Sequence, residues 1–423
     1  MKSPVMISLQ LAPSEPPRPW IPPASLIAGQ VAHGLSWLLL MLTAWPSTPG
    51  LSMPALAWIH TVALGWLTMT ALGVLVHVIP GFMDVEWRLE GMARWSLLPY
   101  GIGVASLVAG FALVQPWLLA TGGTLIVLGL TGYMIPAVLT ILSFKATPTL
   151  KTPFKTGFLS VLGSLAIAAV LGVTMAWALA GAPWPAALIH LPPIHAILAG
   201  GGWLSLLIFG VSTRTIFPVT GRRRTKLPLH VFVSSGFTIG AVLMVLGLIP
   251  GLAHPALRWL GMGLVAIAAA CYVIDMGKLV YHAPNDHKPP IAYVASTLVY
   301  LVATVVLGLG VTGGRAEWQA PLAFVALVGW MGLSVNGYLH HIGIRLLTTM
   351  ARGEDDETPP QELLNPRLSW LGFAGQQVAV LGGTLVLLAG AAQWLPLFGT
   401  FGLLGWLAMM LNIRSAWVRA TAA

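Results

Sequence analysis

Imidazole side chains are the groups best suited to chemistry in this chain, which has 423 residues and 11 histidines. Neutral imidazole binds haem iron and copper, and a histidine inside a membrane is costly unless it is hydrogen-bonded or metal-bound. Carboxylates are nearly absent from the long apolar segments, where Asp275 stands three residues from Lys278 as an expected ion pair, so a carboxylate-based zinc or magnesium enzyme lacks its ligands. The single cysteine, Cys271, excludes an internal disulfide, a Cys-ligated iron–sulfur cluster and covalent c-type haem.

A glycine–tryptophan motif recurs three times inside long apolar segments, at Gly65-Trp66, Gly202-Trp203 and Gly329-Trp330. Each copy has a second glycine eight residues after the first and, twelve residues after it, a polar residue: His77, Arg214 or His341. On a helix these offsets fall within a sector of roughly 120°. Close helix packing alone would explain the glycines and tryptophans, but it does not explain imidazoles at two of the three ends.

The segments that position these residues are membrane spans. Hydrophobic residues make up 57% of the chain and charged residues 8%, with a mean hydropathy of +0.84, far from the composition of soluble proteins. A helix needs about 20 apolar residues to cross a bilayer. Twelve segments qualify: 24–45, 55–80, 94–114, 118–141, 156–180, 191–217, 228–250, 257–281, 291–311, 320–347, 370–390 and 394–414. We therefore predict an all-α polytopic membrane protein with one membrane domain, 24–414, between tails 1–23 and 415–423.

The motif spacing predicts the arrangement of these spans. Four spans separate the first copy from the second, and four separate the second from the third. An even number keeps every copy in the same orientation, as in parallel repeats related by an axis along the membrane normal. We expect three parallel four-helix repeats, about 24–141, 156–281 and 291–414, in a pseudo-threefold arrangement.

Charge asymmetry predicts the orientation. With the N-terminus inside, 19 of the 21 Lys and Arg residues lie at the inner side, and only Arg258 and Arg315 lie outside. We expect a multi-pass protein of a bacterial-type inner (cytoplasmic) membrane with both termini cytoplasmic and no cleavable signal peptide. The basic run 222–226 suits topology or anionic lipid headgroups, so we expect the lipid bilayer and no nucleic acid as a partner.

This orientation sorts the histidines by depth. His60, His190, His195 and His254 are placed at the outer level, and His77, His230, His340 and His341 at the inner level. About 25 Å of helix separates His60 from His77, so they cannot share one metal ion. Repeat symmetry favours a haem held by His77 and His341, with His340 as alternate ligand and Arg214 near a propionate. Alternatively, the imidazoles form interhelical hydrogen bonds and Arg214 extends to the inner surface.

The same residues resemble a known superfamily. Twelve spans with histidines in the second, sixth and tenth are similar to the haem–copper oxidase catalytic subunit and its smaller relatives, the NnrS proteins of the nitric oxide response. Trp58-Ile59-His60 through Gly65 resembles the oxidase pattern of a haem-ligating histidine at the outer end of the second helix. An NnrS-like run comprises His195-Ala196 through Gly200, Gly210-Val211-Ser212-Thr213-Arg214 and Thr220-Gly221-Arg222. The resemblance implies a b-type haem bound by His60 with His195 or His190, and copper at His190, His195 and His230.

The chain also departs from the oxidase pattern. Its seventh span has only His230, at the inner end, and no tyrosine, whereas oxidases carry adjacent histidines and a tyrosine linked to one of them. His340 and His341 lie late in the tenth span, whereas the oxidase counterparts lie toward the outer side. Proton pumping also needs a series of protonatable groups through the membrane, and the spans contain almost no Asp or Glu. We therefore do not expect this chain alone to be a proton-pumping oxygen reductase.

Taken together, the residues predict a haem-binding protein of the nitric oxide response or of respiratory electron transfer, with a cytochrome or quinol as electron donor and with partner subunits. Whether it is an oxidoreductase in its own right stays open. One alternative is a secondary transporter, because parallel repeats and glycine-rich helices also occur in carriers. The other is a non-catalytic membrane subunit of a respiratory complex.

Overall fold

The computed structural model describes residues 21–42, 51–144, 152–183, 190–221, 227–283, 288–353, 356 and 358–422. The regular secondary structure within these ranges is helical, and twelve helical segments are long and apolar enough to cross a membrane. Each coincides with one of the twelve predicted spans. The all-α class and the multi-pass membrane character are therefore confirmed.

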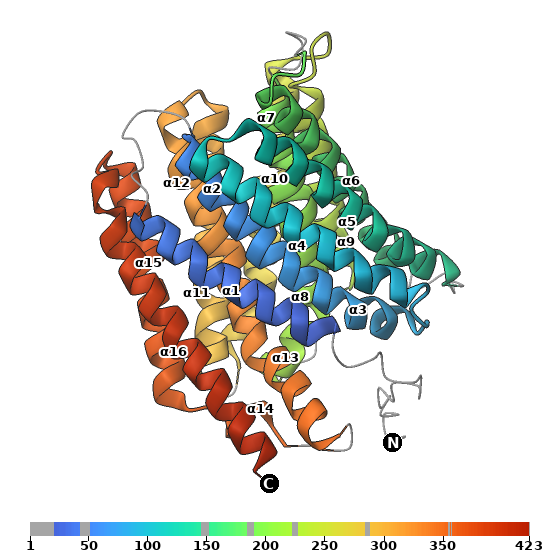
Figure 1. Cartoon of the computed structure of the whole chain (residues 1–423), viewed down its shortest axis with the longest axis vertical. Helices are drawn as coiled ribbons and strands as arrows, with labels where there is room; N and C mark the ends of the chain where they lie inside the picture. The colour runs from blue at the N-terminus through green and yellow to red at the C-terminus, as the bar shows by residue number, and fades with distance from the viewer. Residues whose placement is uncertain are drawn as a thin grey trace.

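Nine spans are formed by one long helix each (Figure 1). They are α1 (Ile21–Leu42), α4 (Glu90–Leu113), α5 (Pro116–Ser143), α6 (Thr152–Leu179), α9 (Leu227–Leu246), α10 (Pro255–Tyr281), α11 (Lys288–Thr312), α15 (Pro366–Leu388) and α16 (Leu395–Thr421). Short helices η5 (Ala316–Trp318), α14 (Pro360–Leu363) and η7 (Ala392–Trp394) lie in the connections. The last span was predicted to end at 414, but α16 continues to Thr421 because helical hydrogen bonding does not need the apolar side chains that mark a span.

The second, sixth and tenth spans are composite, and each has a π-helical centre. The second consists of α2 (Met53–His60), η1 (Thr61–Thr68) and α3 (Met69–Met83). The sixth consists of α7 (Leu191–Ala196), η3 (Ile197–Ser205) and α8 (Leu206–Thr220), and the tenth of α12 (Gln319–Phe324), η6 (Val325–Gly332) and α13 (Leu333–Arg352). Each π segment contains one glycine–tryptophan motif. The prediction that the residues of each motif share one helix face assumed a continuous α-helix. It does not hold through these π-helical centres.

The packing partners of the spans follow one pattern. The closest-packed hairpins are α4 with α5, α9 with α10, and α15 with α16, which are the third and fourth spans of each predicted repeat. Further contacts join α5 to α6, α10 to α11, and α16 back to α1. The spans thus follow one another around the molecule, and the last packs against the first.

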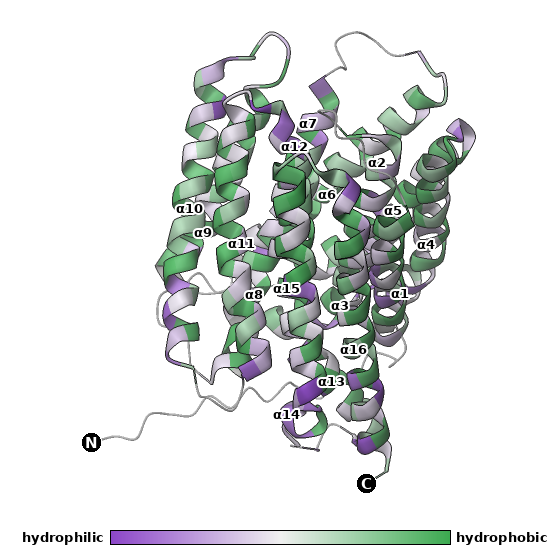
Figure 2. Cartoon of the chain, turned by 90° about the vertical axis from the view of Figure 1, so that its left-hand side faces the viewer, coloured by the Kyte–Doolittle hydropathy of each residue, from purple (hydrophilic) through white to green (hydrophobic). Residues whose placement is uncertain are grey.

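Polarity is distributed as a bilayer requires (Figure 2). Hydrophobic residues cover the middle of the helices, hydrophilic ones gather near their ends, and large apolar side chains such as Leu128, Val170 and Leu385 are exposed on the outside. Within the described ranges, five tryptophans are almost fully buried: Trp37, Trp58, Trp66, Trp203 and Trp330. We call the end at which α13 and α16 finish the inner end, and the end at which α2 and α7 begin the outer end.

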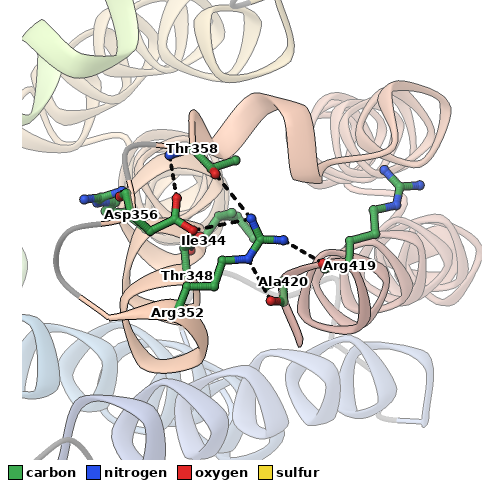
Figure 3. Close-up of polar contacts among 8 residues, drawn as sticks. Ile344, Thr348, Arg352, Asp356, Thr358, Arg419 and Ala420 are labelled. Carbon is green, nitrogen blue, oxygen red and sulfur yellow. Dashed lines mark hydrogen bonds and ion pairs between the residues drawn. The ribbon is translucent and has the colours of Figure 1, made fainter. Parts of the chain in front are cut away.

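A polar clamp joins α13 to α16 at the inner end (Figure 3). The guanidinium of Arg352 donates to the carbonyl oxygens of Ala420 and Arg419, both at 2.8 Å, and its Nη1 lies 3.4 Å from a carboxylate oxygen of Asp356. The backbone amide of Thr358 donates to the other Asp356 oxygen at 2.6 Å. Arg352 therefore satisfies carbonyl groups that the last turn of α16 leaves without helical partners.

Candidate functional site

The three π segments meet in the interior, where η1, η3 and η6 contact one another in pairs. Their tryptophans form hydrogen bonds from one span to another. The Trp203 indole N–H donates to the Thr68 hydroxyl at 2.9 Å, and the Trp330 indole N–H donates to the Ser205 hydroxyl at 3.0 Å. Thr68 and Ser205 occupy the same place, three residues after the motif glycine. The tenth span thus bonds to the sixth, and the sixth bonds to the second.

The third link of this series is missing. Gly332 stands three residues after the tenth-span motif glycine, so it offers no hydroxyl. The Trp66 indole N–H has no hydrogen-bond partner among the described residues. A Cβ at Gly332 would come within 2.7 Å of the Trp66 ring, so the glycine makes room for it. The ring instead stacks on His33 of α1, with centroids 3.5 Å apart and planes 5° from parallel.

Two of the predicted haem ligands come together at the outer level. The imidazole centroids of His60 and His195 are 6.4 Å apart, and the ring planes differ by 26°. His60 is the last residue of α2, and His195 lies one residue before the end of α7. Each imidazole therefore sits directly before a π segment. α2 packs against α4 and η1, whereas α7 packs against α6 and η3, so the two near-parallel rings come from separate groups of helices.

Backbone carbonyl groups fix the tautomer of both imidazoles. Nδ1 of His60 lies 2.7 Å from the carbonyl oxygen of Leu56, and Nδ1 of His195 lies 2.9 Å from that of Ala168 on α6. A carbonyl oxygen only accepts, so each Nδ1 carries the proton. The Nε2 atoms are then left with free lone pairs. Metal-bound histidines are commonly held by a hydrogen bond of this kind.

Neighbouring residues restrict the two rings further. Phe111 of α4 stacks on His60 with centroids 4.9 Å apart. On the other side, a Cβ at Gly172 of α6 would lie 3.1 Å from Cε1 of His195. The glycine thus leaves the space that the second imidazole occupies. Both histidines are only half-buried, so part of each side chain is accessible.

The separation of the two rings is close to that of two imidazoles bound to one ion. Two imidazoles bound through Nε2 to one ion, at about 2 Å each, would hold their centroids about 6 Å apart. The observed 6.4 Å matches that spacing, and the tethered Nδ1 atoms leave the correct nitrogens available. Leu56 and Ala168 act through backbone carbonyl groups, which no side-chain pattern in the sequence could have indicated.

The predicted copper ligands are not gathered into one site. Within the ranges that the structure describes, no three His, Cys, Asp or Glu side chains are close enough to hold a metal ion together. His190 is exposed at the outer end before α7, and His230 is buried near the start of α9. Of the predicted set His190, His195 and His230, His195 lies beside a fourth histidine, His60.

The inner histidines lie on helices with different neighbours. His77 is on α3, which packs against α1, α5 and α6, whereas His341 is on α13, which packs against α8, α11 and α16. His340 is directed toward α11, since its ring lies 5.0 Å from that of Tyr293 and its Nδ1 lies 2.7 Å from the Asn336 carbonyl oxygen. Arg214 belongs to α8, but its side chain lies outside the described residues.

Comparison of the sequence with known protein families and with curated proteins found no match.

Proposed function

We propose that this chain is a haem-binding membrane protein in which His60 and His195 are the axial ligands of a b-type haem. The observation that carries the proposal is their facing arrangement, 6.4 Å between centroids, with both Nδ1 atoms bound to carbonyl oxygens. This favours the outer placement over the pair His77 and His341. It also makes His195, rather than His190, the partner of His60.

The protein's own residues would hold and orient the ligands. The carbonyl groups of Leu56 and Ala168 prevent ring rotation and make each Nε2 a better electron donor. Phe111 packs on one imidazole and limits access of water to it. A bound haem would supply one-electron chemistry. If His60 and His195 both bound the iron, the protein would be suited to electron transfer rather than to binding a gaseous ligand.

We infer that the architecture is the three-repeat, pseudo-threefold arrangement predicted from the motif spacing. Three observations support it: a π segment in the second, sixth and tenth spans, the repeated close hairpins, and contacts from one predicted repeat to the next that return from α16 to α1. This supports the resemblance to NnrS proteins and oxidases at the level of architecture. The biological setting we propose is the nitric oxide response or respiratory electron transfer at an inner membrane, with cytoplasmic termini and a cytochrome or quinol as donor.

The absorption spectrum of the purified protein tests this proposal against its alternatives. Protein made in cells supplied with haem precursor should show a Soret band, and dithionite should sharpen the α and β bands of a low-spin haem. Metal analysis should find iron in proportion to protein. The same analysis would reveal any bound copper. A colourless preparation that stays colourless after addition of haemin would reject haem binding and favour the transporter alternative.

A further inference from the structure

A second group of buried polar side chains lies far from His60 and His195 in sequence, between α11, α13 and α15. Asn336, Gln376 and Tyr293 are each no more than 1% exposed. The Asn336 amide N–H donates to Oε1 of Gln376 at 2.8 Å. Within the described part of the chain, Oδ1 of Asn336, Nε2 of Gln376 and the Tyr293 hydroxyl have no hydrogen-bond partner. These three atoms are an acceptor, a donor and a group that can act as either.

The fold does not require a polar residue at this position. Asn336 follows the tenth-span motif glycine by seven residues, and the counterparts in the second and sixth spans are Leu72 and Phe209. Both are fully buried apolar residues. An unpaired amide inside a membrane protein is costly, so a polar group here is best explained by something that binds to it.

Tyr293 is held so that its hydroxyl faces the same region. Its ring packs against His340 and Phe373, with centroids 5.0 Å and 5.1 Å away. Its hydroxyl lies 3.6 Å from the point where a Cβ of Gly372 would be, and the backbone nitrogen of Met409 lies 3.6 Å from that point. Gly372 is one turn before Gln376 on α15. The hydroxyl therefore lies at the α15–α16 contact, on the face that carries Gln376.

A small cavity lies beside His340, whose ring packs against that of Tyr293. It is lined by Leu339, His340, Ile344, Leu364, Met409, Asn412 and Ile413. The Asn412 amide N–H donates to the Ser369 hydroxyl at 2.7 Å and to the Asn365 carbonyl oxygen at 3.2 Å. Asn365 caps the first turn of α15, at the inner end. Polar groups thus border the cavity on both sides, with His340 toward the interior and Asn412 toward the inner end.

Hydrogen bonds continue from Tyr293 toward the π segments. The Ser296 hydroxyl donates to the Tyr293 carbonyl oxygen at 2.8 Å and accepts from the Gln377 amide at 3.0 Å. The Tyr300 hydroxyl donates to Oε1 of Gln377 at 2.9 Å. The Tyr300 ring in turn packs where a Cβ of Gly329 would lie, 2.9 Å from its Cγ. A line of polar groups therefore extends from the inner end to the tenth-span motif.

We propose that one water molecule bridges Asn336, Gln376 and Tyr293, and that it enters from the inner end by way of the cavity beside His340. Water has two donors and two acceptor sites, which match the three unpaired atoms. The site belongs to the third predicted repeat, because Leu72 and Phe209 replace the asparagine in the other two.

Brief hydroxyl-radical labelling tests the proposal, since radicals formed from a bound internal water oxidise the side chains beside it. In the intact protein in detergent, Tyr293 and Met409 should be labelled, although both are at most 1% exposed. Tyr133 and Met276 are the matched controls, because they are equally buried and the Tyr133 hydroxyl is already bonded to the Leu72 carbonyl oxygen at 2.6 Å. If Tyr293 and Met409 are labelled no more than Tyr133 and Met276, at the background level, the proposal is overturned.

The variant Asn336→Leu with Gln376→Leu tests the same site by removing its polar atoms, following the leucine of the second span. Labelling of Tyr293 should fall at least several-fold, while that of Tyr133 stays constant and reports on the fold. If Tyr293 remains labelled in a folded variant, the bridging water is rejected. If the variant does not fold, the labelling of Tyr293 relative to Tyr133 in the unmodified protein still decides whether the water is present. Haem content plays no part in either readout, so the result is independent of the His60–His195 proposal.

Discussion

At the scale of single residues, the ring that an imidazole faces separates a ligand-ready histidine from a structural one, because the Nδ1 hydrogen bond is common to both. His60 and His195 each commit Nδ1 to a carbonyl oxygen and face each other with Nε2 unprotonated. His33, in contrast, is fully buried, hydrogen-bonded to Gln30 at 3.2 Å and stacked on Trp66. The same side chain therefore serves as a metal ligand in our proposal in one place and as packing in another.

The space left by Gly172 leads to a prediction about the ligand site. A methyl group there would lie 3.1 Å from the His195 ring and displace it, so Gly172→Ala should weaken haem binding about tenfold. Gly163→Ala is the control, because it lies on the same helix with open space around it. Haemin titration of the two purified variants measures the difference. Equal affinities would show that Gly172 does not position His195.

Gly332 leads to a second prediction at this scale. Its added Cβ would meet the buried Trp66 ring at 2.7 Å, and that ring cannot retreat because it stacks on His33. Gly332→Ala should therefore destabilise the protein by about 1–3 kcal/mol. Gly210→Ala, in a part of α8 with nothing within 4 Å of the added atom, should be close to neutral. Unfolding in detergent by heat or by denaturing surfactant provides the comparison, and a neutral Gly332→Ala would contradict the close contact.

At the scale of elements, the sequence predicted the spans well but not their interior. Hydropathy indicates where a helix crosses a membrane, so all twelve spans were found. It contains no signal for a π turn, because the residues around each motif are apolar whichever hydrogen-bond pattern they adopt. The hydroxyl groups of Thr68 and Ser205 three residues after two motif glycines were a visible signal of the tryptophan links. The link itself requires the helices to be placed in three dimensions.

Those links should contribute measurably to stability. Ser205→Ala removes the acceptor of the Trp330 indole, and Thr68→Val removes that of Trp203. Each change should cost roughly 1 kcal/mol, the usual size for a hydrogen bond between membrane helices. Thr174→Val is the control, because the Thr174 hydroxyl donates to the Val170 carbonyl oxygen within its own helix, α6. Losses from the two interior changes no larger than that of the control would refute the importance of the links.

The clamp at the inner ends of α13 and α16 should make stability depend on pH. The Thr358 hydroxyl and amide, and then Arg352, lower the pKa of Asp356 below its ordinary value of 3.8. A lowered folded-state pKa stabilises the protein above the unfolded pKa, and this contribution disappears as the pH falls through the folded value. At pH 7, the melting temperature of Asp356→Asn should therefore lie below that of the unmodified protein. The two melting temperatures should converge as the pH falls below about 4. A difference that is the same at both pH values would contradict this.

At the scale of the whole molecule, the sequence indicated the depth of each histidine along its span. It did not indicate which neighbouring helix the side chain faces. Counting residues along a span gives depth, which is why both an inner and an outer pair remained open. Which helices face each other is decided by packing around the molecule, and this brings His60 to His195 while His340 turns to Tyr293. The resemblance to NnrS proteins and oxidases pointed to the outer level, and the repeat symmetry pointed to the inner one. Our proposal takes the outer level, because His60 and His195 come within 6.4 Å of each other there.

Reduced-minus-oxidised spectra of four single variants test the central claim most directly. His60→Ala and His195→Ala should each lose the low-spin α band, because each removes one axial nitrogen from the proposed haem. His77→Ala and His341→Ala should keep it, with Gly163→Ala as a control for the effect of substitution alone. The reverse result, a band lost in His77→Ala and His341→Ala but retained in His60→Ala and His195→Ala, would contradict the account and move the haem to the inner level.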